Sequence, residues 1–155
     1  MPTSLCRPVR AAMGGVVLAL TLTGCGLLSG EITADVGECI TMQLLDDQFD
    51  GAEEGELTGI PTVGCSEEHD GQVIHVYDIP GSDWPGTDSV HSSIEEECLP
   101  AFEDYVGTSY AESDLDIYSL TPIEQSWDEG DREVICIAYL IDGSTTTETF
   151  EDSGL

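Results

Sequence analysis

REVICIAYLI, residues 132–141, is one of the two strong strand signals in the chain. Its β-branched and aromatic residues favour an extended backbone, and apolar side chains occupy both of its alternating faces. Such a strand is covered on both faces, so we expect it at the centre of a sheet. QVIHVYDI, residues 72–79, predicts a second strand, in which alternation would put Val73, His75 and Tyr77 on one face.

Weaker patterns surround these two strands. Short strands are expected at 37–45, 60–65 and 116–122, with a turn at Asp142-Gly143 that could return 144–150 as an edge strand. Pro61 suggests an edge position or a strand start for 60–65.

Segment 46–59 is acidic and glycine-rich, which indicates a loop. Its residues 46–57 look like a degraded calcium loop, because Asp46, Gln48 and Asp50 occupy ligand positions. The last position, which should be a bidentate glutamate, is a leucine, so we interpret the segment as an acidic loop without metal.

One principal helix is expected after Thr87 or Asp88, either of which can cap it. An apolar stripe then recurs at four-residue steps, at Val90, Ile94, Cys98 and Phe102. Pro100 should kink or restart this helix, and Gly107 should end it. Pro122 suits the first position of a short second helix. The pattern predicts an α+β domain: a mainly antiparallel sheet with one principal helix packed on a face.

Four cysteines fall within the expected domain, and an even number in an exported chain indicates disulfides. Three connectivities are open. We favour Cys39–Cys65, which would join two strands, and Cys98–Cys136, which would tie the helix to the strand beneath it. The absence of a Cys-x-x-Cys pair argues against a zinc ribbon or a thioredoxin-like site.

The N-terminus has the pattern of an export signal. Two arginines and no acid precede a short apolar run, which ends at Leu22-Thr23-Gly24-Cys25. That quartet resembles the bacterial lipobox, whose cysteine receives diacylglycerol and becomes the first mature residue. We therefore expect a lipoprotein signal at 1–24, a lipidated Cys25 with a tether at 25–35, and one domain at 36–155. The acyl chains would anchor the domain to the extracytoplasmic face of the cell membrane.

The mature chain would be extremely acidic. After residue 24 it keeps Arg132 as its one cation against 32 acids, a formal charge of −31. This charge excludes nucleic acid as a partner, since such binding needs a basic surface. We interpret it first as a solvated surface, with Ca²⁺ or Mg²⁺ binding as the sharper alternative.

Candidate functional side chains are few: His69, Trp84, Trp127 and Arg132. His69 could bind metal or move protons with Asp70, although no third ligand is apparent, and a turn-stabilising role is simpler. Arg132 could recognise an anion, or form a structural pair with an acid. Trp127 is expected in the core, and Trp84 is expected to be exposed, where it could stack on sugar or peptide. No nucleophile motif is present, so we predict no catalytic residue, no cofactor and no enzyme activity.

Several blocks together resemble one family. They are DVGECI, TVGCSEEHDGQVIHVYDIP, WPGTDSV, CLPAFEDYVG and PIEQSWDEGDREVICIAY, in this order from about Asp35. They are similar to the septum formation family of actinobacterial secreted and membrane-tethered proteins. Glu68 departs from that pattern, where many members carry proline.

The resemblance implies a link to cell division or envelope remodelling and no enzyme activity. Our leading hypothesis is a non-enzymatic envelope lipoprotein that binds an envelope protein or a wall polymer. The alternatives are a metal-dependent or carboxylate-based enzyme acting on wall polymers, and a Ca²⁺-responsive binder.

Overall fold

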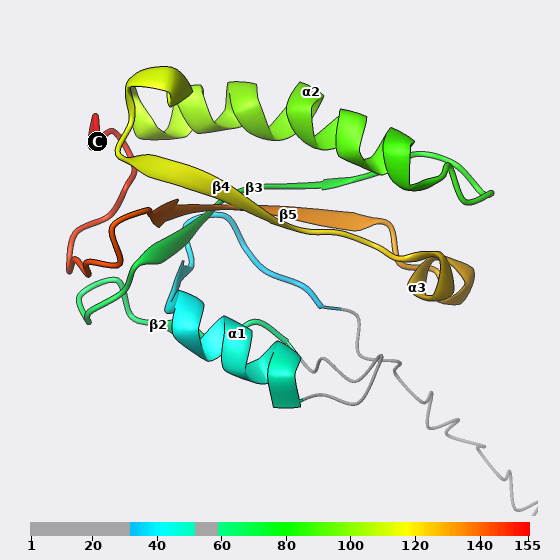
Figure 1. Ribbon diagram of the computed structural model, residues 1–155, viewed down its shortest axis with the longest axis horizontal. Helices are drawn as coiled ribbons and strands as arrows, with labels where there is room; N and C mark the ends of the chain where they lie inside the picture. The colour runs from blue at the N-terminus through cyan, green and yellow to red at the C-terminus, as the bar shows by residue number, and fades with distance from the viewer. Residues whose placement is uncertain (1–31, 52–58) are drawn as a thin grey trace, which may run out of the picture.

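A computed structural model describes residues 32–51 and 59–155. Its sheet has five strands in the order β2-β1-β3-β5-β4, each antiparallel to its neighbours (Figure 1). The strands are β1 (Cys39–Ile40), β2 (Thr62–Val63), β3 (Gly71–Asp78), β4 (Leu115–Leu120) and β5 (Glu133–Leu140). The predicted central strand is confirmed, because β5 lies between β3 and β4, and β2 occupies the predicted edge.

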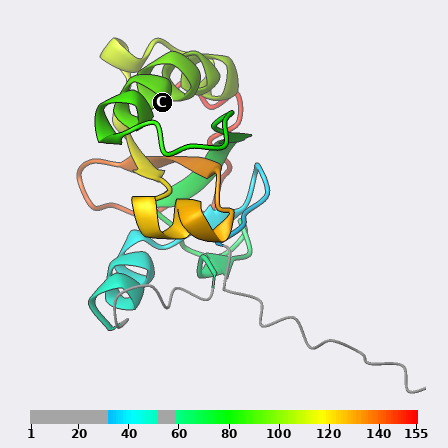
Figure 2. The same ribbon diagram turned by 90° about the vertical axis from the view of Figure 1, so that its right-hand side faces the viewer.

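Helices cover both faces of the sheet. Helix α2 (Thr87–Val106) lies along one face and α1 (Met42–Gly51) lies on the other, so the domain has three layers (Figure 2). Strand β5 supplies both interfaces: Cys136 and Ala138 pack in the cluster beneath α2, whereas Ile135 and Ile137 pack in the cluster on the α1 side. The predicted α+β class is therefore confirmed.

Helix α2 follows the predicted apolar stripe. Val90, Cys98 and Phe102 are buried against the sheet. The helix continues through Pro100 without restarting, and Gly107 ends it in the left-handed conformation. The expected side-chain cap at Thr87 or Asp88 is wrong, because Gly86 occupies the cap position.

Helix α1 corrects the prediction for the first part of the domain. Only β1 is extended within the predicted strand 37–45, and α1 replaces both the end of that strand at 42–45 and the start of the predicted loop at 46–51. The backbone N–H of Met42 donates to Asp70 Oδ1 at 2.7 Å, so a carboxylate distant in sequence caps the helix. Because Asp46 and Gln48 lie on this helix, they do not form a calcium loop. The rest of that candidate, 52–57, lies outside the described residues.

A β-bulge in β3 corrects the predicted facing of its side chains. Val73 pairs with Ile137, but the next paired residue is His75, opposite Cys136, so Ile74 is the extra residue. Val73 therefore packs in the α1-side cluster, while Ile74 packs beneath α2. After the bulge His75 also lies on the α2 side, opposite Cys136.

The C-terminal segment corrects the other strand prediction. Residues 144–150 do not form an edge strand, and Thr146 instead makes one isolated bridge with His69. The segment packs beside α2, where Phe150 is fully buried. Short elements complete the fold: the 3₁₀ helix η1 (Tyr110–Glu112) and α3 (Glu124–Glu129). Ile123 takes the cap position of α3, so Pro122 precedes the helix rather than starting it.

Both predicted disulfides are present. Cys39 is bonded to Cys65 and joins β1 to the segment that follows β2. Cys98 is bonded to Cys136 and fastens α2 to β5. Among the described residues no helix is both long enough and apolar enough to cross a bilayer.

Candidate functional site

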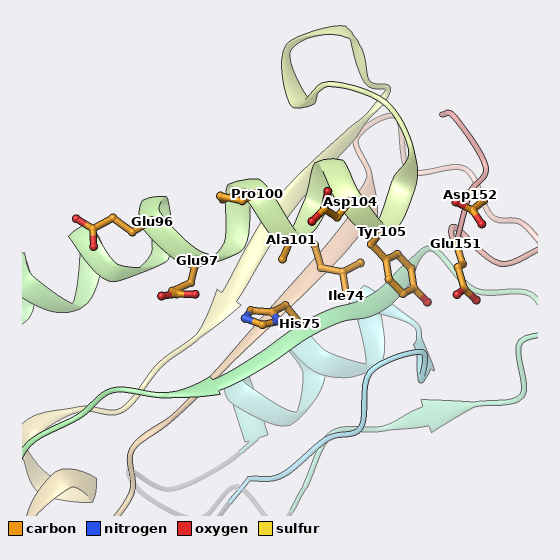
Figure 3. Close-up of a pocket in the computed structure, with 10 residues that line it drawn as sticks. All are labelled: Ile74, His75, Glu96, Glu97, Pro100, Ala101, Asp104, Tyr105, Glu151 and Asp152. Atoms are coloured by element: carbon orange, nitrogen blue, oxygen red, sulfur yellow. The ribbon is translucent and has the colours of Figure 1, made fainter.

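An open groove of about 590 Å³ lies along the second half of α2 (Figure 3). Ile74 and His75 of β3 form its floor, and Pro100 and Ala101 line it from α2 (Figure 3). Tyr105 lies between the helix and the C-terminal segment. Five carboxylates line the groove from two elements: Glu96, Glu97 and Asp104 on α2, and Glu151 and Asp152 on the C-terminal segment.

The bulge in β3 shapes the floor of the groove. Because Ile74 is the extra residue, the imidazole of His75 comes to the same side of the sheet as α2. The His75 ring stacks on Tyr77, with 5.5 Å between ring centroids. Tyr77 in turn shares a hydrogen bond of 3.0 Å with Ser93 of α2, so the floor is held from both elements.

Pro100 removes one backbone hydrogen bond from the α2 wall. Proline has no backbone N–H, so the carbonyl of Glu96, one turn earlier, lacks the donor that an ordinary helix would supply. Both residues line the groove. Ala101, next along the helix, is small and leaves room above the floor.

The C-terminal wall is clamped by a buried glutamine. Gln72 Oε1 accepts hydrogen bonds from the Phe150 N–H at 2.6 Å and the Thr149 hydroxyl at 3.1 Å. Its Nε2 donates to the carbonyl of Gly37 at 3.0 Å, so one side chain joins the two ends of the described domain. Further along, the N–H of Asp152 donates to the carbonyl of Tyr105 at 2.9 Å.

The charge of the groove is not balanced by the chain itself. Arg132 is the only lysine or arginine after residue 24, and it lies away from the groove lining. The groove carboxylates are exposed, and Tyr105 is half-buried beside them. Burial raises the pKa of Tyr105, a hydrogen bond with Thr149 lowers it, and the charge of Glu151 raises it further. The site is therefore a negatively charged groove with a partly apolar floor.

Three predicted site residues come together at the other end of α2. Trp127 is 2% exposed and donates from Nε1 to the carbonyl of Ser82 at 3.2 Å. The Arg132 guanidinium carbon lies 3.7 Å from the centre of the Trp127 ring, a cation–π contact. Trp84 packs edge-on against Trp127, with centroids 5.5 Å apart. We call Trp84, Trp127 and Arg132 the Trp–Arg corner.

The corner is a structural unit rather than an anion site. The Arg132 guanidinium donates to the carbonyl of Trp127 at 2.8 Å and to that of Gly81 at 3.1 Å. These bonds fasten the loop before α2 to the turn before β5. Trp127 is in the core, as predicted, whereas Trp84 is half-buried rather than exposed.

His69 lies apart from both the groove lining and the corner. It is fully buried, and its Nδ1 is 2.9 Å from the carbonyl of Glu67. Its backbone exchanges two hydrogen bonds with Thr146, and its ring lies 5.8 Å from that of Phe150. Its expected partner Asp70 caps α1 instead. Across 32–51 and 59–155 no group of three or more histidine, cysteine or acidic side chains could hold a metal.

Sequence reasoning missed the groove. Its acids are inconspicuous in a chain with 32 of them, and His75 was assigned to the same face as Val73. The adjacent Pro100 and Ala101 in an otherwise acidic helix face were the available signal. Cys25, the predicted lipidation site, lies outside the described residues.

A family model described as septum formation matches residues 6–136. This span includes the segment before Cys25 and ends at Cys136 of β5. No curated protein matches the chain, and no solved structure matches it. Because the match covers most of the sequence, the chain belongs to the septum formation family.

Proposed function

We propose that this protein is a lipid-anchored module on the extracytoplasmic face of the cell membrane, where it binds an envelope partner without catalysing a reaction. Membership of the septum formation family supports a role in cell division or the envelope. The Leu22-Thr23-Gly24-Cys25 quartet after a cationic and apolar segment supports the anchor. The pairing of all four domain cysteines fits an oxidising compartment.

The groove is the observation that carries the binding function. A concave site with an apolar floor and charged walls is suited to holding a ligand. The side chains that line it are carboxylates, one histidine, one tyrosine and three apolar residues, with no serine, threonine or cysteine nucleophile. A tethered domain with such a groove can hold a partner near the membrane.

The enzymatic alternative has one observation in its favour. His75 shares the groove with Glu97 and Asp104, and such groups can act as general acids and bases. His69, the histidine that the sequence suggested for binding metal or moving protons, is buried elsewhere. The two functions differ in how strongly a single side chain should matter.

Single neutral substitutions in the groove separate these functions. Exposed ion pairs are worth ~0.2–1 kcal/mol each, so Glu97→Gln, Asp104→Asn or His75→Ala should each lower function by less than about tenfold. Loss of an acid–base group typically lowers a rate by ~10²–10⁴. Septum formation in cells that carry only the variant gene measures the effect. A collapse of septation with any one variant, at normal protein levels, would favour the enzyme.

The anchor is tested separately with Cys25→Ser. We expect the native protein to begin at a diacylated Cys25 by mass spectrometry and to partition with membranes. The serine variant should keep residues 1–24 and lose the lipid. An unmodified Cys25 in a cytosolic fraction would contradict the proposed location.

A further inference from the structure

We propose that the groove holds a lysine- or arginine-rich polypeptide segment, contributed by a partner on the side of the domain that faces away from the membrane. This inference rests on the proposed binding function and names the class of partner. It is carried by the shape of the groove, its floor, its charge and its position relative to the first described residues.

The shape of the groove suits a short extended segment. Its α2 wall runs from Glu96 to Tyr105, which is about 14 Å along the helix axis. This length accommodates about four residues of an extended peptide. Glu151 and Asp152 form the second wall, which adds two carboxylates near the C-terminal end of the helix. A segment that lies along the groove would meet acids from both walls.

The floor matches the chemistry of long cationic side chains. Lysine and arginine have aliphatic stems that pack on apolar surface while their charged ends remain in polar surroundings. Ile74 on the floor, with Pro100 and Ala101 on α2, supplies such a surface among the carboxylates.

The charge favours an extended polycation over a single metal ion. The five groove carboxylates are divided between α2 and the C-terminal segment. Among the described residues, no group of three or more histidine, cysteine or acidic side chains could hold a metal ion. A chain with several cations can instead meet several acids at once. Arg132 is the one lysine or arginine among the described residues and is engaged at the Trp–Arg corner, so the groove carboxylates remain open to a cationic partner.

The position of the groove indicates the side from which the partner comes. Ile32, the first described residue, packs in the α1-side cluster, across the sheet from α2 (Figure 1). The seven residue-to-residue steps from Cys25 to Ile32 can span at most ~25 Å. A lipid on Cys25 would thus hold the α1 side next to the membrane, and the groove would face outward.

Binding to the full-length protein in neutral detergent tests this assignment. The probe is a short peptide alternating lysine and alanine, with the glutamate–alanine peptide as its charge-reversed control. The groove variant combines Glu97→Gln, Asp104→Asn and Glu151→Gln. Its matched control removes the same charge elsewhere, through Asp46→Asn, Asp47→Asn and Asp128→Asn. All six side chains are exposed, so both variants should fold.

We expect the groove variant to weaken binding of the lysine peptide at physiological ionic strength by about tenfold, or ~1.4 kcal/mol, and the control variant by less than about twofold. Equal losses would show that binding follows net charge alone and would overturn the proposal. Ala101→Phe fills the groove without changing its charge. It should weaken peptide binding and leave spermidine binding unchanged. An unchanged peptide affinity in Ala101→Phe would also overturn the proposal.

These outcomes are distinct from failure of the proposed function. Absence of lipid on Cys25 would undo the anchor and the outward orientation but would not alter peptide affinity in detergent. Conversely, if the lysine peptide does not bind while septation still depends on the groove residues, the binding module stands and its partner is not a cationic segment.

Discussion

The Trp–Arg corner and the acidic groove lie at opposite ends of α2 and treat charge in opposite ways. At the corner, the single cation of the domain is stacked on Trp127 and hydrogen-bonded to carbonyls, so its binding capacity is used within the fold. In the groove, five carboxylates line an open surface, and the described residues contain no lysine or arginine besides Arg132. Residue types that are rare in this chain, tryptophan and arginine, thus serve the fold. The candidate site is instead lined mainly by aspartate and glutamate, which are abundant throughout the sequence.

The largest expected effect is at the corner. Trp127→Ala should lower the free energy of unfolding by ~3–5 kcal/mol, because it empties a buried site and removes the surface on which Arg132 stacks. Denaturant unfolding measures the loss. Trp84→Ala is the matched control and should cost clearly less, since Trp84 is only half-buried. Similar losses for both would contradict the assignment of Trp127 as the core of the corner.

The second largest loss of stability is expected at Gln72, which clamps the C-terminal wall of the groove. Gln72→Ala leaves the Phe150 N–H and the Gly37 carbonyl without their partner, which should cost ~2–3 kcal/mol. Amide exchange at Phe150 should also become faster, because the C-terminal wall loses its anchor. Gln48→Ala is the control: Gln48 Oε1 is buried without a described hydrogen-bond partner, so its removal should cost little. An unchanged amide exchange rate at Phe150 would show that Gln72 does not anchor the C-terminal wall.

A charge-conserving change then tests why the cation is an arginine. Arg132→Lys retains the charge but loses the planar group that stacks on Trp127 while donating to two carbonyls. Stability should fall by ~1–2 kcal/mol. Binding of the lysine peptide in the groove should not change. If the folded Arg132→Lys variant bound the lysine peptide more weakly, the two ends of α2 would be energetically coupled.

Asp116 offers a carboxylate that the fold does satisfy. It accepts hydrogen bonds from the hydroxyls of Tyr110 and Tyr139 and from the N–H of Ile117. Its hydrogen bond raises the pKa of Tyr110 to about 12, and the hydrogen bond from Tyr110 lowers the pKa of Asp116.

These two pKa shifts make the stability of the fold depend on pH at both extremes. The Tyr110 contribution to stability is lost as pH rises from ~10 towards 12, and the Asp116 contribution is lost as pH falls below ~4. In an absorbance titration, Asp116→Asn should lower the pKa of Tyr110 from about 12 towards its ordinary value, whereas the pKa of Tyr118, which is raised mainly by burial, should not change. A wild-type Tyr110 that ionises near its usual pH would contradict this network.

Local patterns were sufficient for the parts of the fold that depend on local physics. Runs rich in β-branched and aromatic residues predict β3 and β5, four-residue spacing predicts α2, and the inward position of Cys98 suggests its disulfide with Cys136. The misses depend on partners distant in sequence. Asp70 caps α1 from 28 residues away, and Gln72 holds Phe150 from 78 residues away.

The site was hidden for a related reason. A bulge at Ile74 changes the facing of His75, and strict alternation cannot reveal an extra residue. The groove acids were visible but could not be told apart from the rest of an acidic chain. Only the packing of the C-terminal segment beside α2 shows which of them share one surface.

Amide chemical-shift mapping of the full-length protein with the lysine–alanine peptide tests the central claim most directly. We predict that the largest shifts fall on Ile74, His75, Ala101 and Tyr105, with little change around Trp127 or on α1. Shifts spread evenly over the acidic surface, or centred on α1, would show that the groove is not the binding site.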